Sequence, residues 1–182
     1  MKKNIAIFTP MANEEMNAKK FILKILIFKN YFNKFRYFII LDNVSTDNTY
    51  KIVKALEKKN NSLTVIWAPK NKTVVDAYMT GYRNCLKTNS DWILEIDAGG
   101  SHKPINLFNF IKFIEHDYDC IFGSRFCKGG KMLNSNFLRY LFSRGGSLLT
   151  KIFFKINLMD TTSGYQMFKK EILKKIIKKR LL

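Results

Sequence analysis

The sequence predicts an α/β domain built on a mostly parallel central sheet that is flanked by helices. Short apolar runs alternate along the chain with amphipathic stretches of helical period. Polar residues typical of ligand sites follow the ends of several apolar runs. Strands that alternate with helices favour a parallel sheet. The 182 residues contain neither repeats nor a low-complexity linker, so we expect one domain, 1–182, with a proper core.

The first half of the chain shows this alternation most regularly. In chain order the expected elements are strand 4–9, helix 14–28, strand 36–42, helix 47–59, strand 63–68, helix 73–87 and strand 91–97. The strands are apolar runs such as RYFIILD, and the first helix places Phe21 and Ile25 on one face. The second helix opens with the capping sequence Ser45-Thr46-Asp47.

The second half departs from the pattern after residue 125. A helix is expected from Pro104, because proline is favoured in the first turn, and a strand at 118–124. A loop rich in Gly, Asn and Ser follows, and then a helix over about 136–155. The turn NLMDTTSG leads to a last helix from about Lys169.

The opening MKKNIAIFTPMANEE resembles a signal peptide only in its basic start and short apolar run. The run is too short, and Asn13-Glu14-Glu15 stand where a small-residue cleavage site would be. No apolar stretch reaches the roughly 18 uncharged residues that cross a bilayer. We therefore expect a cytoplasmic protein.

The net charge of +18, from 32 Lys and Arg against 14 Asp and Glu, favours anionic partners. Most of the excess is Lys, and Asn is also abundant, as an AT-rich genome could produce without selection for binding. We expect no nucleic-acid partner, because no recognisable nucleic-acid module is present. The three cysteines are irregularly spaced and predict free thiols rather than disulfides or a zinc site.

Unusual polar residues follow the predicted strand ends, where ligands bind in parallel sheets. Asp97 ends the strand in DWILEIDAGGSHKP, and a carboxylate there is costly unless it is paired or holds a cation. Such a cation could neutralise a diphosphate, which the following glycines would let approach the backbone. Arg125, Arg139 and Arg144 could bind phosphate oxygens in bidentate fashion. Together these residues indicate a nucleoside-diphosphate ligand.

Several of these residues also have a structural interpretation, which for some is the stronger one. Asp47 is well explained as a helix cap. Glu95 shares a strand face with Asp97 and could supply a second carboxylate, although pairing with a neighbouring Lys is favoured. His102 is interpreted as a turn residue that orders the loop rather than as a metal ligand. Asp160 is a weak candidate for a general base.

Seven segments occur in the order of a known family: PMANEE, LDNVSTDNT, DAYMTGY, EIDAGGSHKP, FGSRFCKGG, LRYLFSRGGSLL and DTTSGYQMFKKE. The chain resembles the inverting GT-A glycosyltransferases of the family 2 type, and in particular dolichol- and polyprenyl-phosphate mannose synthases. The resemblance covers roughly the whole chain and implies a Rossmann-like GT-A domain. It also leads us to expect that the family's C-terminal portion, with a loop that closes over the donor, is missing.

The resemblance implies roles for individual residues. A nucleotide-sugar site would include Pro10, Ala12, Asn13, Glu14, Asp42, Asn43, Asp76, Asp97, Ala98 and Gly99. Phosphates of the donor or of a lipid acceptor would be held by Arg125, Arg139 and Ser143. Asp97 and Arg125 would be catalytic, and Asp97 and Ser101 would bind Mg²⁺ or Mn²⁺.

The sequence departs from the family pattern at three of its positions. Asn43 stands where a second acid reads the base, and Thr73 stands where a glycine is usual. Gly99 replaces the second Asp of the Asp-Ala-Asp motif. That replacement leaves one carboxylate where related enzymes have two.

The expected activity is inverting transfer of a sugar from a nucleoside-diphosphate sugar to a polyprenyl phosphate. A metal and cations would neutralise the leaving diphosphate. A lipid phosphate is already ionised, whereas a sugar hydroxyl acceptor would need a base. The alternatives are transfer to a cell-surface glycan and a catalytically impaired homologue that binds nucleotide sugars.

The final segment FKKEILKKIIKKRLL predicts a basic amphipathic helix. Such a helix suits peripheral contact with the anionic inner face of a membrane. The alternative is a helix that packs on the core and exposes its Lys face.

Overall fold

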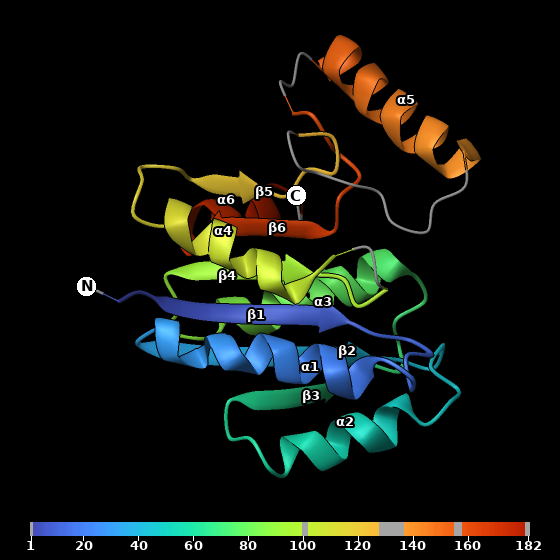
Figure 1. The fold of residues 1–182 in the computed structure, drawn as a ribbon, viewed down its shortest axis with the longest axis vertical. Coiled ribbons are helices and arrows are strands. Elements are labelled where there is room, and N and C mark those ends of the chain that lie inside the picture. The colour runs from blue at the N-terminus through green and yellow to red at the C-terminus, as the bar shows by residue number, and fades with distance from the viewer. Residues whose placement is uncertain (1, 100–101, 128–136, 155–157, 181–182) are drawn as a thin grey trace.

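The computed structural model describes residues 2–99, 102–127, 137–154 and 158–180. One sheet contains six strands in the order β3-β2-β1-β4-β6-β5 (Figure 1). The strands are β1 Asn4–Pro10, β2 Lys34–Leu41, β3 Leu63–Trp67, β4 Trp92–Ile96, β5 Cys120–Phe122 and β6 Tyr165–Lys169. Strands β1 to β4 are parallel to one another, and β6 is antiparallel to both β4 and β5. The mostly parallel sheet predicted from the sequence is confirmed.

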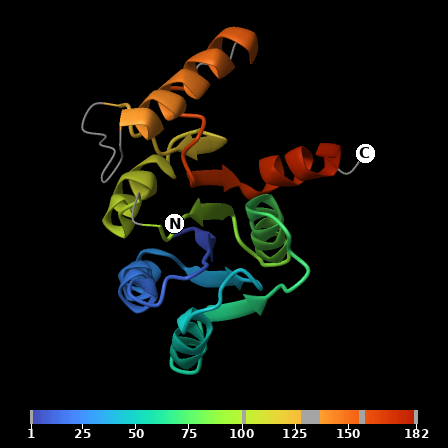
Figure 2. The same ribbon diagram turned by 90° about the vertical axis from the view of Figure 1, so that its right-hand side faces the viewer.

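Helices cover both faces of the sheet (Figures 1 and 2). They are α1 Ala18–Leu26, α2 Thr49–Glu57, α3 Val74–Leu86, α4 Leu107–Phe113, α5 Phe137–Phe154 and α6 Lys170–Arg180, with 3-10 turns η1 Ile27–Tyr31 and η2 Pro104–Asn106. Helices α1, α2 and α4 pack on one face, where Ile5 and Ile7 of β1 point. Helices α3 and α6 pack on the other, against Ala6 and Phe8 of the same strand. The alternation along β1 therefore separates two cores.

Helix α2 begins two residues later than expected, with Asn48 at its N-cap. Asp47 still serves the helix end, because its Oδ1 accepts a hydrogen bond of 2.9 Å from the backbone N–H of Thr49. Its Oδ2 accepts another, of 3.0 Å, from the backbone N–H of Glu15. One carboxylate therefore caps α2 and ties the loop after β1 to it.

Strand β6 is the element that the sequence does not reveal. We expected a turn leading directly to a helix near Lys169, but Tyr165–Lys169 forms a strand between β4 and β5. Its five residues run straight into α6, so their local pattern cannot be told from the start of that helix. Antiparallel pairing with β4, in which Glu95 lies opposite Gln166, supplies the backbone hydrogen-bond partners that make this segment a strand.

Helix α6 packs on the sheet through part of its apolar face. Leu173 and Ile177 are buried with the core of the α3 face, whereas Ile176 is exposed beside Lys174 and Lys175. This is the core-packing arrangement that the sequence left as an alternative. The peripheral membrane contact expected of this helix has no support in its described contacts.

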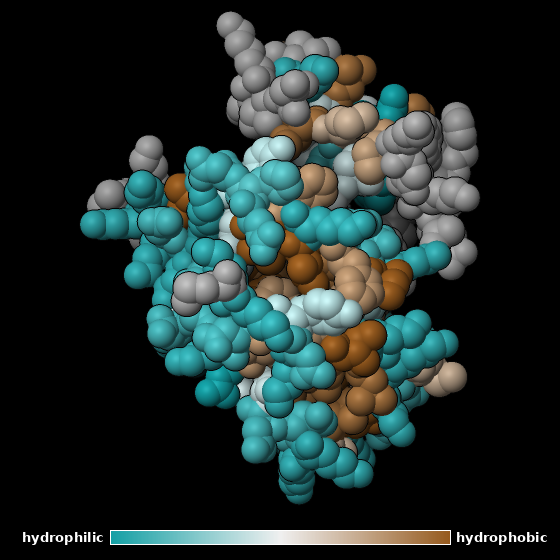
Figure 3. All heavy atoms as spheres, turned by 60° about the vertical axis from the view of Figure 1, so that its left-hand side comes forward, coloured by the Kyte–Doolittle hydropathy of each residue, from teal (hydrophilic) through white to brown (hydrophobic). Residues whose placement is uncertain are grey.

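Helix α5 projects from the body of the domain (Figures 1 and 2). Several of its large apolar side chains are exposed, namely Leu141, Phe142, Leu148, Leu149 and Phe153. The face of the molecule in Figure 3 is otherwise mostly hydrophilic, with hydrophobic residues gathered in patches. None of the helices in the described ranges is long and apolar enough to span a membrane. The three cysteines are free, as predicted.

Candidate functional site

The loops that follow β1 and β2 are joined to each other at the carboxyl edge of the sheet. Asn13 adopts a left-handed backbone conformation with φ of 55°, which asparagine tolerates better than most residues. Its Oδ1 accepts a 2.9 Å hydrogen bond from the backbone of Thr46, and its Nδ2 donates to the carbonyl of Val44 at 3.1 Å. The backbone N–H of Glu14 donates to Thr49 Oγ1 at 2.8 Å. Asn13 therefore shapes this edge through bonds that no local sequence pattern signals.

Asp42 and Asn43 lie directly after β2, as predicted. Asp42 is buried, and its Oδ1 accepts a 3.1 Å hydrogen bond from the backbone N–H of Val44. The side-chain amide of Asn43 donates to the carbonyl of Pro69 at 3.1 Å, which joins this loop to the one after β3. The side-chain amide of Asn43, where the family pattern has an acid, therefore has a hydrogen-bond partner within the protein.

Asp97 follows β4 and is held from two sides. The hydroxyl of Tyr78 on α3 donates to its Oδ1 at 2.8 Å. Its backbone N–H donates to the carbonyl of Gly164 at 3.1 Å, and a Cβ on Gly164 would overlap the Asp97 carboxylate. Burial raises the pKa of Asp97, and the Tyr78 hydrogen bond opposes that rise. Gly164 thus supplies space that the carboxylate needs.

Glu95 lies on the same face of β4 as Asp97, as strand alternation predicts. It is buried and accepts a short hydrogen bond from the Tyr82 hydroxyl. Burial raises the pKa of Glu95 to about 7, with a further rise from the Asp97 charge, while the Tyr82 bond lowers it. The expected pairing of Glu95 with a neighbouring Lys is wrong, because its hydrogen-bond partner is Tyr82 of α3.

Asp76 lies in the first turn of α3 and caps that helix. Its Oδ2 accepts hydrogen bonds from the backbone N–H groups of Lys72 at 3.0 Å and Thr73 at 2.9 Å. The Thr73 hydroxyl in turn accepts from the backbone N–H of Asp76 at 3.2 Å, which completes a capping box. These bonds lower the pKa of Asp76. Thr73, where the family usually has glycine, thus has a local structural role.

Arg125 follows β5 and forms a bidentate ion pair with Asp160 in the segment before β6. Nε and Nη2 of Arg125 each donate at 2.8 Å, and its backbone N–H donates at 3.0 Å. Thr162 also donates to Asp160 from its backbone and its hydroxyl, each at 3.2 Å. Burial raises the pKa of Asp160, but the bonds and charge of Arg125 outweigh it and leave the pKa lowered. Asp160 is therefore a partner of Arg125 rather than a general base.

His102 is buried beside this pair. Its ring lies edge-on to Tyr165, with ring centroids 5.6 Å apart. Burial lowers its pKa to about 4, and the Arg125 charge acts in the same direction. A neutral, packed histidine agrees with the interpretation of His102 as a residue that orders its loop.

The remaining predicted residues are described to different extents. Pro10 ends β1, Ala12 is exposed in the next loop, and Ala98 is buried. Ser143 is half-buried in α5, and Arg144 lies over the Phe126 ring at 5.2 Å from its centroid. Ser101 and the side chain of Arg139 fall outside the described residues.

Gly99 is exposed and lies near Glu14. A Cβ placed on Gly99 would have Glu14 Oε1 as its nearest neighbour, at 4.0 Å. The first loop therefore brings a carboxylate towards the position where the family has its second Asp. This neighbourhood was not apparent from the sequence, because the two residues are far apart along the chain.

The residues at this edge could bind a divalent cation only together with oxygen ligands from a substrate. Within the described ranges, no group of three or more His, Cys, Asp or Glu side chains is arranged to hold a metal ion. Asp97 offers a half-buried carboxylate, whose Oδ2 packs against Gly164. Mg²⁺ commonly binds through one or two carboxylates together with substrate phosphates. The donor set thus fits an ion that arrives with a diphosphate, and not one held by protein side chains alone.

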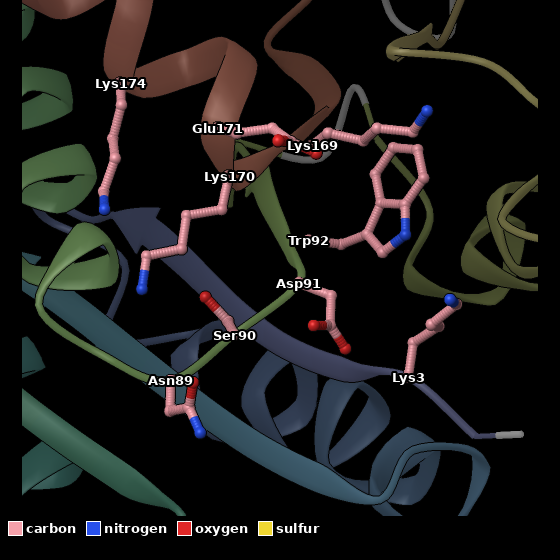
Figure 4. A pocket seen from close by; sticks show the side chains of 9 residues that line it. All are labelled: Lys3, Asn89, Ser90, Asp91, Trp92, Lys169, Lys170, Glu171 and Lys174. Carbon is pink, nitrogen blue, oxygen red and sulfur yellow. The ribbon is translucent and has the colours of Figure 1, made fainter.

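A hollow lies at the opposite edge of the sheet, around the amino end of β4 (Figure 4). Its lining includes Asp91, Lys169 and Lys170. Lys169 pairs with Asp117 at 3.2 Å and with Asp119 at 3.1 Å, and Lys170 donates to the carbonyl of Thr88. Because β4 separates this hollow from Asp97, it is not part of the candidate site.

Comparison with known proteins identifies the family of the chain. Residues 6–177 match the profile of the family described as glycosyl transferase family 2. The chain belongs to this family. The family resemblance inferred from the sequence motifs is therefore confirmed.

Two curated family members show considerable similarity. The undecaprenyl-phosphate mannosyltransferase of Micrococcus luteus is 31% identical over 138 residues, which is 76% of this chain and 56% of that protein. The polyprenol monophosphomannose synthase of Mycolicibacterium smegmatis is 25% identical over 139 residues, which is 76% of this chain and 52% of that protein. The chain thus spans about half the length of the curated relatives that it matches.

Solved structures of related fold include two with bound nucleotide sugar. Glucosyl-3-phosphoglycerate synthase from Mycobacterium tuberculosis, in complex with Mn²⁺, UDP-glucose and phosphoglyceric acid, aligns with a TM-score of 0.65 at 17% identity, over 93% of this chain and 57% of that chain. A mannosyltransferase from Pyrobaculum calidifontis, in complex with GDP-Man and Mn²⁺, aligns at 0.62 and 14% identity, over 97% and 47%. These similarities confirm the GT-A fold of this family 2 chain.

Proposed function

We propose that this family 2 domain transfers a sugar from a nucleoside-diphosphate sugar to a polyprenyl phosphate with inversion. The observation that carries the proposal is the placement of Asp97 at the carboxyl end of β4, held by Tyr78 and beside Gly164 and Gly99. Parallel sheets bind ligands at this edge. The names of the two curated relatives support a polyprenyl phosphate acceptor.

The reaction is a single in-line displacement at the anomeric carbon of the sugar. The bond from that carbon to the diphosphate breaks, and the leaving nucleoside diphosphate takes the electron pair. An oxygen of the lipid phosphate forms the new bond from the opposite side. This oxygen is already ionised, so the acceptor needs no general base, which agrees with the occupation of Asp160 by Arg125.

Residues of this chain would hold the two substrates at the edge. We assign base and ribose contacts to the loops that carry Pro10 to Glu14 and Asp42 to Asn43, with Asp76 at the start of α3 nearby. Ala98 and Gly99 would lie along the donor diphosphate. Arg125, whose orientation Asp160 fixes, would face phosphate oxygens together with Arg139 and Ser143 of α5.

We further propose that Mg²⁺ or Mn²⁺ binds together with the donor through Asp97, with Ser101 as the second expected ligand. Such an ion supplies charge that stabilises the leaving diphosphate. The solved neighbours with Mn²⁺ support this use of a metal for the fold in general. Because the acceptor is a lipid, we place the reaction at the inner face of the membrane, where a cytoplasmic enzyme would act peripherally.

The test measures donor binding and transfer separately. Thermal shift with UDP- and GDP-sugars, with and without Mn²⁺, should show stabilisation by a nucleotide sugar that increases with the metal. Labelled sugar should then pass into the organic phase when a short polyprenyl phosphate is added, and not with the matching polyprenol.

Each alternative function has its own outcome. Binding without transfer to any acceptor would favour the impaired homologue, which Gly99 in place of Asp suggests. Transfer to an oligosaccharide instead of to the lipid would favour glycan extension. Stabilisation that is indifferent to metal would remove the metal-binding role of Asp97.

A further inference from the structure

Helix α3 and strand β4 are joined by two tyrosine–carboxylate hydrogen bonds. Tyr78 donates to Asp97 at 2.8 Å, and Tyr82 donates to Glu95. The two tyrosines are one helical turn apart, and the two carboxylates are two residues apart on one strand face. One turn of α3 therefore spans the same stretch as two residues of the strand, and each tyrosine reaches its own carboxylate.

Packing on β1 holds both tyrosines in place. The Phe8 ring, which is fully buried, lies edge-on to Tyr82 with ring centroids 4.7 Å apart and to Tyr78 with ring centroids 6.5 Å apart. Tyr82 in turn contacts Phe168 of β6, with ring centroids 6.1 Å apart. Aromatic neighbours restrict ring movement, so the hydroxyl groups have well-defined positions.

The two carboxylates differ in what else surrounds them. Glu95 is 5% exposed and lies within the sheet, opposite Gln166. Asp97 lies just beyond the strand and is only half-buried; Tyr78 donates to its Oδ1, and its Oδ2 packs against Gly164. Of the pair, only Asp97 lies at the edge where a ligand can approach. Tyr78 contacts the outer carboxylate, and Tyr82 the inner one.

The orientation of Asp97 matters more in this chain than it would with a second carboxylate beside it. Gly99 contributes no side chain to the motif, so Asp97 supplies the one carboxylate of the motif itself. Groups that orient a ligating side chain typically change metal affinity or activity by about 10- to 100-fold when removed. A residue that holds Asp97 is thus a candidate for this effect.

We propose that Tyr78 is a positioning residue, whose hydroxyl orients Asp97 towards the donor diphosphate, whereas the Tyr82–Glu95 pair stabilises the same helix–strand contact without acting on the donor. The inference rests on the proposed function. Tyr78 does not touch the reacting atoms; it acts through Asp97.

The test compares Tyr78→Phe with its matched control Tyr82→Phe. Each substitution removes one hydroxyl from the same face of α3 and keeps the aromatic ring. We expect Tyr78→Phe to weaken binding of the nucleotide sugar in the presence of Mn²⁺, measured by titration calorimetry, about tenfold or more. Tyr82→Phe should lower the melting temperature, because it leaves buried Glu95 without its donor, and should change donor affinity less than about twofold.

A double-mutant cycle separates positioning from a general loss of structure. Asp97→Asn alone should weaken metal-dependent donor binding, and adding Tyr78→Phe to it should cause little further loss, because the hydroxyl acts only through that carboxylate. Additive losses would overturn the inference. Equal losses of affinity in Tyr78→Phe and Tyr82→Phe would also overturn it.

The failure of this inference can be told from the failure of the proposed function. A wild-type protein that binds no nucleotide sugar, with or without Mn²⁺, would remove the function and the inference together. A wild-type protein that binds the donor while Tyr78→Phe binds it equally well would remove only the inference. If Tyr78→Phe does not fold, the donor affinity of Tyr78→Met, which also lacks the hydroxyl, decides: a loss of about tenfold or more supports positioning, and wild-type affinity contradicts it.

Discussion

Gly81 of α3 lies directly against the ring of Phe8 on β1. A Cβ on Gly81 would overlap that ring, which is fully buried between the helix and the sheet. The missing side chain lets α3 approach the sheet closely enough for Tyr78 and Tyr82 to reach the carboxylates of β4. Gly81 therefore sets the distance between the sheet and helix α3, which carries the Tyr78 that holds Asp97.

Gly81→Ala should destabilise the protein despite the better helix propensity of alanine. Propensity alone would favour alanine by about 1 kcal/mol. Overpacking a buried ring costs about 1 to 3 kcal/mol, and we expect it to prevail. Urea denaturation would measure the difference. Gly145→Ala in α5 is the matched control, because among the described residues no atom outside its own stretch of helix lies within 4 Å of its Cβ position, and it should be neutral or stabilising. A Gly81→Ala variant as stable as wild type would contradict the close contact.

Asp160→Asn should lower the free energy of unfolding by about 3 kcal/mol or more, because it leaves Arg125 without its counter-charge in a buried site. The Asp160 side chain is fully buried, and that of Arg125 is 11% exposed. Lys54→Ala removes a partly exposed ion pair with Glu57 and serves as the control, with an expected loss below about 1 kcal/mol. Similar losses for both variants in urea denaturation would contradict the structural role of Asp160.

His102 should make stability fall as the pH falls below neutrality. Its pKa is lowered from 6.5 to about 4, so between these values the unfolded chain binds a proton that the folded protein excludes. The free energy of unfolding therefore decreases from pH 6.5 towards pH 4, by an amount on the order of 3 kcal/mol from this group. The stability advantage of wild type over His102→Asn should shrink over this range in urea denaturation. A difference that is constant with pH would show that His102 titrates normally.

Gly99→Asp should strengthen metal binding in the presence of a nucleotide. The position is exposed, and the nearest atom to a new Cβ is Glu14 Oε1 at 4.0 Å, so the side chain has room. A second carboxylate beside Asp97 adds an oxygen ligand, and we expect about a tenfold lower dissociation constant for Mn²⁺. The same substitution in an Asp97→Asn background should restore only part of the affinity. No change in either background would place the metal elsewhere.

Most of the sheet was predictable because its signals are local. The apolar runs of β1 to β4 and the polar residues after them occupy a few consecutive positions, so period and composition reveal them. Asp97 could be nominated for the same reason, since an acid at the end of a buried strand is unusual by itself. Strand β6 was not predicted, because five residues beside a helix carry too little pattern and β4, with which it pairs, lies far away in the chain.

The sequence by itself determined the parallel α/β order, the strand-end location of Asp97 and its lack of a second carboxylate at Gly99. Only the tertiary structure decided which side chains form hydrogen bonds or ion pairs with the site residues. Tyr78 lies 19 residues before Asp97, and Arg125 lies 35 residues before Asp160. Such pairs form only when helices and strands pack at a particular distance and register. Contacts such as that of Gly81 with Phe8 set this distance. Local periodicity records which face a residue occupies, but not which residue it meets there.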